Sequence, residues 1–88
     1  MSDKNYDKIL KFVKEVDGDT RYIIWEAGEG CFSVAFSDRL KDKAESLVHK
    51  GILRRLPRGP SPFHDRYGLT RKGRGIYRVL VKEEKVEM

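Results

Sequence analysis

Cysteine, long apolar runs and a leader-like start are all missing or scarce in this sequence. Cys31 is the only cysteine, so the chain forms no internal disulfide and no cysteine-based zinc cluster. Unbroken apolar runs such as 23–25 and 79–81 span three residues, far too few to cross a membrane. The first twenty residues lack the apolar core of a signal peptide. We therefore expect a cytoplasmic protein without a membrane partner.

Catalytic signatures are scarce as well. No Ser/His/Asp set stands in a nucleophile context, and the glycines at 28, 30, 73 and 75 match no phosphate-binding loop. Two histidines without a cysteine pair do not form a metal-ligand pattern. We expect no enzyme, no metal, no cofactor and no small-molecule ligand. An effector bound near Trp25 is the weakest alternative.

Acidic residues are few in one part of the chain. The 88 residues, enough for one small domain, carry 19 Lys/Arg and 14 Asp/Glu, a net charge of +5. Residues 49–78 hold 9 of those cations and a single acid, Asp65, whereas residues 1–48 are slightly acidic. Concentrated positive charge indicates a polyanionic partner, most simply nucleic acid.

Apolar periodicity predicts helices over 3–16, 38–50 and 71–84. Ser37 or Asp38 is placed to cap the second of these helices, and Gly51 stands where a left-handed residue ends it. Thr70 is placed to cap the last helix, which carries a basic stripe opposite its apolar face. That stripe consists of Arg71, Arg74, Arg78, Lys82 and Lys85.

Two further segments have strand signals. Residues 52–69 read as a hairpin, with strands at 52–57 and 67–69 around a tip that contains Gly59, Pro60 and Pro62. Residues 20–36 are ambiguous. They fit a short helix from Thr20 to Ala27 followed by a glycine-broken turn, or an additional hairpin that pairs 21–26 with 31–36.

The order of these motifs resembles a known family. A helix runs into Leu47-Val48-His49-Lys50-Gly51-Ile52-Leu53, a basic hairpin follows, and Tyr67-Gly68-Leu69-Thr70-Arg71-Lys72-Gly73 closes it. This resembles the small stand-alone winged helix-turn-helix regulators of the MarR, PadR and ArsR type, which occur in bacteria and archaea. The resemblance implies an α+β fold, with a three-helix core, a two-stranded wing at 52–69 and a C-terminal helix over 71–84.

The resemblance also implies a DNA site. The helix over 38–50 would be the recognition helix in the major groove, and the wing would reach phosphates or an adjacent minor groove. On this helix the wheel places Asp38, Asp42 and Glu45 outward, so the wing would supply most of the attraction. The implied groove-facing residues are Ser37, Arg39, Lys41, Asp42, Lys43 and Ser46, and the implied wing contacts are Arg54, Arg55, Arg58, His64 and Arg66.

The leading hypothesis is therefore a transcriptional regulator that binds double-stranded DNA sequence-specifically and acts by occupying an operator. A domain this small has a limited footprint, which favours a homodimer on a pseudo-palindrome. Phe12, Tyr77 and Val81, on the first and last helices, are the candidates for the dimer contact. The alternative is a winged-helix module that binds a protein or structured RNA, suggested by the mixed charge of the helix over 38–50.

Overall fold

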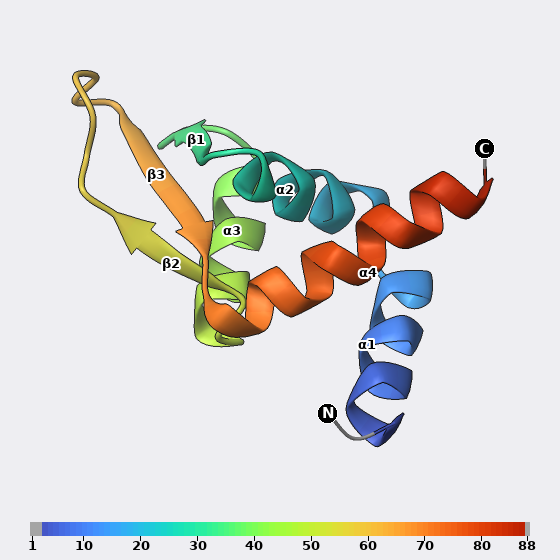
Figure 1. The fold of residues 1–88 in the computed structure, drawn as a ribbon. Coiled ribbons are helices and arrows are strands. Elements are labelled where there is room, and N and C mark those ends of the chain that lie inside the picture. The colour runs from blue at the N-terminus through green and yellow to red at the C-terminus, as the bar shows by residue number, and fades with distance from the viewer. Residues whose placement is uncertain (1–2, 88) are drawn as a thin grey trace.

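The computed structural model describes residues 3–87, with side chains described for residues 6–84. Over this range the chain is a small α+β domain of four helices and one three-stranded antiparallel sheet (Figure 1). The elements in chain order are α1 (Asp3–Glu15), α2 (Gly18–Gly28), β1 (Phe32–Ala35), α3 (Leu40–His49), β2 (Leu53–Leu56), β3 (His64–Leu69) and α4 (Arg71–Glu87).

The ambiguous segment 20–36 forms a helix and then a strand. Ile23, Ile24 and Ala27 are all buried, and with Thr20 they form one face of α2 at helical spacing. β1 follows, but it pairs with β3 rather than with residues 21–26. The helix alternative is therefore confirmed for the first half, and the additional hairpin within 20–36 is wrong.

The sheet has the strand order β1-β3-β2. The expected hairpin is present as β2 and β3, but its second strand begins at His64 instead of residue 67. β3 is longer because it is the central strand: Ala35 lies opposite His64 and Phe32 opposite Tyr67, so β1 extends the ladder toward the tip. Residues 36–39 join β1 directly to α3, so a strand lies between α2 and α3 along the chain.

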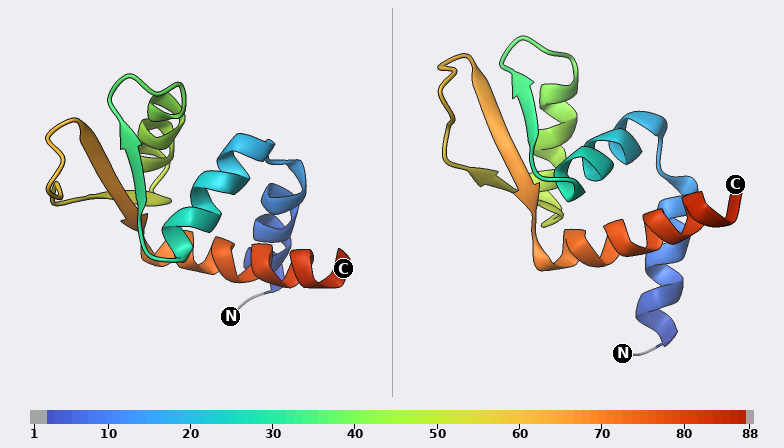
Figure 2. Two further views of the ribbon diagram at one scale, coloured as in Figure 1. Left: turned by 90° about the horizontal axis from the view of Figure 1, so that it is seen from above. Right: turned by 45° about the horizontal axis from the view of Figure 1, so that its top comes forward.

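The core lies where α2, the sheet and the remaining helices meet. Tyr67 and Ile23 have no solvent exposure, and Ile52, Leu53 and Leu80 are nearly as buried. α2 packs against both α3 and α4, and the two views in Figure 2 show it between them. α1 packs chiefly on α4, so it extends from the rest of the domain (Figure 1).

The junction between α3 and α4 is tightly fixed. Gly51 has φ 78°, the left-handed conformation expected of it. The Thr70 hydroxyl accepts a hydrogen bond from the Gly73 amide at 3.0 Å, which confirms the cap, and donates to the Gly51 carbonyl at 2.5 Å. A Cβ on Gly73 would lie 2.2 Å from the Ile52 carbonyl oxygen, so only glycine allows this approach. These contacts set the direction in which α4 leaves the sheet.

Candidate nucleic-acid interface

The cations at the start of α3 are paired with acids at the start of α2. Lys43 donates to Asp17 and lies 3.4 Å from Asp19, and Arg39 forms an ion pair with Asp19 at 2.6 Å. The Lys43 ammonium and the Thr20 hydroxyl lower the pKa of Asp17 to about 2. Two expected groove-facing cations thus lie over the α2–α3 contact, where neighbouring carboxylates offset their charge.

Lys41 does not face solvent as expected. Its ammonium reaches the sheet, where it lies 2.8 Å from an Asp65 oxygen, 2.9 Å from the Tyr67 hydroxyl and 3.1 Å from Glu45. Glu45, expected on the outward face, also accepts from the Tyr67 hydroxyl. The apolar stripe defines the inward face of α3, but the sheet also covers the flank beside it. That flank carries Lys41 and Glu45.

The charges in this network reinforce one another. Hydrogen bonds from Arg55 first and from Tyr67 second lower the pKa of Glu45 to about 2. The carboxylate of Asp65, followed by the Tyr67 hydroxyl, raises the pKa of the Lys41 ammonium, and Lys41 in turn lowers the pKa of Asp65. Burial, with Glu45 as second cause, raises the pKa of Tyr67. At neutral pH the carboxylates are charged, Tyr67 is neutral, and the network fastens α3 to the sheet.

Two of the expected wing arginines lie on the same side of the sheet as the network of Lys41, Glu45 and Tyr67. Arg55 donates to both carboxylate oxygens of Glu45. Arg58 donates to Asp65 at 3.2 Å, and its guanidinium carbon lies 4.9 Å from the centroid of the Phe36 ring. Both arginines remain more than half exposed, but each has a carboxylate partner.

The other two wing arginines lie on the opposite face of the sheet. Successive side chains along a strand point to opposite faces, so Arg54 projects away from the side that Arg55 occupies, and Arg66 away from the side of Tyr67. Arg66 donates to the Cys31 sulfur at 3.5 Å. Among the described side chains neither Arg54 nor Arg66 forms an ion pair.

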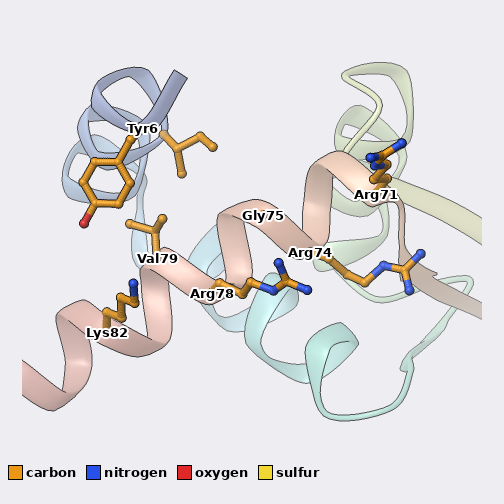
Figure 3. A pocket seen from close by; sticks show the side chains of 8 residues that line it. Tyr6, Arg71, Arg74, Gly75, Arg78, Val79 and Lys82 are labelled. Carbon is orange, nitrogen blue, oxygen red and sulfur yellow. The ribbon is translucent and has the colours of Figure 1, made fainter. Parts of the chain in front are cut away.

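The basic stripe of α4 continues this face. Arg54 and Arg74 line one small pocket together with Gly68 and the end of α2. Arg74 also lines a larger groove of about 680 Å³, which α4 forms with Tyr6 and Ile9 of α1. Figure 3 shows the basic side chains of this groove in succession along α4. They are Arg71, Arg74, Arg78 and Lys82. Lys85, expected in the same stripe, lies outside the described side chains.

We call Arg54, Arg66, Arg71, Arg74, Arg78 and Lys82 the basic face. No carboxylate within the described part of the chain forms an ion pair with any of the six, and all except the half-buried Arg66 are exposed. α3 covers the face of the sheet that carries Arg55 and Tyr67, so Arg54 and Arg66 project from the face opposite α3. Six cations without an ion-pair partner among the described residues therefore follow one another over this surface, and lysines 8, 50 and 72 lie apart from it around a second groove.

The remaining expected site residues are scattered. Ser37, Asp42 and Ser46 are exposed on or beside α3, where Asp42 brings negative charge to the solvent face. His64 is half-buried, and its Nδ1 lies 2.7 Å from the Ser61 hydroxyl. The structure does not bring together the eleven residues proposed from the family pattern, because they divide between the two faces of the sheet.

The three residues expected at a dimer contact also have different surroundings. The Tyr77 ring packs within the chain, 5.8 Å from Trp25 between centroids, and a Cβ on Gly28 would lie 2.3 Å from it. Val81 is half-buried. Phe12 lines a groove of about 600 Å³ with Ile9, Ile52 and Ile76 and with lysines 8, 50 and 72.

Sequence reasoning identified the stripe of α4 but did not place it in the site. The available signal was the spacing 71, 74, 78 and 82 without an acid in the first two turns. Over the described residues, no helix has the length and hydropathy to cross a membrane, and no three potential metal ligands of the His, Cys, Asp or Glu type cluster together.

The fold and the basic face define a small α+β domain with six cations that have no ion-pair partner among the described residues. Comparisons with protein-family models, with curated proteins and with solved structures gave no match.

Proposed function

We propose that this chain binds double-stranded DNA, and that the basic face supplies the contacts to phosphate. One observation carries the proposal: the cations of the basic face have no carboxylate partner among the described residues, whereas every described cation between Arg39 and Lys43 has one. A field of one sign on one side of a small domain favours a linear polyanion. The net charge of +5 acts in the same direction.

The spacing of the cations suits a phosphate backbone. Arg71 and Lys82 are eleven residues apart on α4, which corresponds to about 16 Å at a helical rise of about 1.5 Å per residue. This length matches about five base-pair steps of about 3.4 Å each. Arg54 and Arg66 extend the contact onto the sheet. In this arrangement α4 lies along the backbone, and α3 does not enter the major groove.

The scaffold supports a winged-helix interpretation in part. The hairpin β2–β3 projects from the body (Figure 1), and one of its faces carries Arg54 and Arg66 of the basic face. Phosphate contacts fix position without reading sequence. We therefore assign the base contacts of a sequence-specific regulator to the hairpin, whose strands carry Arg54 and Arg66.

A salt titration tests the proposal. Fluorescence anisotropy of a labelled 20-base-pair duplex is measured between low and physiological salt. We expect log K to fall with log[salt] with a slope between about −3 and −5, since each neutralised phosphate contributes about −0.9. Lys11→Glu, on the exposed side of α1, changes the net charge but not the basic face, and serves as the control. Absence of binding at low salt would contradict the proposal.

A protein-binding role is the second candidate. The observation that favours it is the groove around Phe12, with its apolar floor and lysine rim. An acidic amphipathic helix, or the homodimer contact expected at Phe12, would use this surface. Sedimentation of the free protein distinguishes a homodimer contact from a site for another protein. A dimer that Phe12→Glu dissociates supports self-association, and a monomer at all concentrations contradicts it.

A further inference from the structure

The end of the hairpin carries exposed aromatic surface. Phe63 is 70% exposed, the highest value among the large apolar residues of the described chain, and Phe36 is 42% exposed. The loop 57–63, which joins β2 to β3, lies at the end of the hairpin away from α4 (Figure 1). These rings contribute little to the core, so their position needs another explanation.

The tip is held in place by specific contacts. The Phe36 amide donates to the Phe63 carbonyl at 3.0 Å, which ties the tip to the turn between β1 and α3. The Ser61 hydroxyl contacts His64 Nδ1 at 2.7 Å and lies 3.4 Å from the Phe63 amide. Pro57, Pro60 and Pro62 restrict the backbone further. Phe63 is therefore presented on an ordered support, which lowers the entropy cost of binding through it.

Arg58 adds a cation to the aromatic surface. Its guanidinium stacks on Phe36, and its ion pair with Asp65 fixes that position. Aromatic rings and arginine planes are the groups on which proteins stack unpaired nucleobases. Apolar side chains at such tips also act as wedges between base steps in the minor groove.

We propose that the hairpin tip is a stacking platform, in which Phe63 stacks on a nucleobase displaced from the helix and the Phe36–Arg58 pair, tied to Phe63 through the Phe36 amide, is a second stacking surface. The proposal rests on the proposed DNA-binding function and deepens it: Arg54 and Arg66, on one face of the hairpin, hold phosphates, while the exposed Phe63 at its tip selects DNA that is easily unstacked. A fully paired duplex would be bound less tightly than one that already contains an unpaired base, since unstacking is then no longer required.

The test uses two duplexes of equal length, one fully paired and one with a single bulged 2-aminopurine. Wild-type protein should bind the bulged duplex more tightly than the paired one. Its binding should change the fluorescence of the 2-aminopurine. Phe63→Ala should lose that preference by roughly 5–150-fold, the factor that corresponds to base–aromatic stacking of about 1–3 kcal/mol. Phe63→Tyr should retain it and Phe63→Leu should not, because leucine keeps apolar bulk without a π-face.

The outcomes are distinct. Equal affinity of wild type for both duplexes, or a preference that Phe63→Ala leaves unchanged, overturns the platform but leaves the DNA-binding function standing. Absence of binding to either duplex at low salt overturns both. Because Phe63 is exposed, its variants should unfold at the wild-type temperature. Tyr22→Ala, which removes another exposed aromatic ring, should keep the preference.

Discussion

α3 and α4 both carry several cations, yet the two helices use them differently. On α3, Arg39, Lys41 and Lys43 each lie within ion-pair distance of a carboxylate from α2, α3 or β3. On α4, four cations follow one flank and none forms an ion pair with a described carboxylate. A paired cation fastens elements together, whereas an unpaired one leaves its field available to a partner. Counts of charge along a sequence do not distinguish the two.

The largest expected effect comes from reversing charge on α4. Arg74→Glu combined with Arg78→Glu should weaken duplex binding by at least roughly 100-fold at low salt. The salt slope should fall by about 2, since each phosphate that the protein no longer neutralises removes about 0.9. Both side chains are exposed, so the melting temperature should change little. Retained affinity in a folded double variant would show that α4 does not bind the duplex.

The second effect is on stability and belongs to α3. Glu45→Gln removes the carboxylate that Arg55, Tyr67 and Lys41 share. We expect a loss of about 1–3 kcal/mol in the free energy of unfolding, as for other hydrogen-bonded groups deprived of a charged partner. The salt slope for DNA should stay at its wild-type value. Urea denaturation and anisotropy measure the two quantities separately.

The same carboxylate predicts a dependence on pH. The pKa of Glu45 is lowered to about 2 in the folded chain, from an ordinary value of 4.5. A depressed carboxyl pKa contributes stability that is fully present above the unfolded value, and this stability is lost as pH falls from about 4.5 toward 2. Stability measured across this range should fall less steeply for Glu45→Gln than for wild type. Parallel curves would exclude Glu45 as a contributor.

The smallest effect should come from Lys43. Its ion pairs with Asp17 and Asp19 are about half exposed, and exposed ion pairs contribute little to stability. Lys43→Ala should therefore leave both the free energy of unfolding and the duplex affinity near those of wild type. A tenfold loss of affinity would return α3 to the DNA interface.

Much of the fold was predictable from the sequence because its signals are local. The apolar spacing of 3–16, 38–50 and 71–84, the glycine at 51 and the threonine at 70 each act within a few residues. Local signals did not decide between a helix and a hairpin for residues 20–36. Ile23 and Ile24 favour strands by propensity. They are helical here because α2 packs against both the sheet and α4, which buries these two side chains.

The division of charge was beyond sequence reasoning for a different reason. Lys41 meets Asp65 across 24 positions, and Lys43 meets Asp17 across 26. Only the packing of α3 between α2 and the sheet creates these pairs. Strand geometry predicts that Arg54 and Arg55 point to opposite faces of the sheet. It does not predict which of these faces the helices cover.

These two adjacent arginines provide the most direct test of the central claim that unpaired and paired cations have different roles. Arg54→Gln and Arg55→Gln produce proteins of the same composition and net charge. The measurement is the slope of log K against log[salt] for each variant on one duplex. We predict a shallower slope by about 0.9 for Arg54→Gln and a wild-type slope for Arg55→Gln. Equal slopes, or a larger change for Arg55→Gln, would contradict the account.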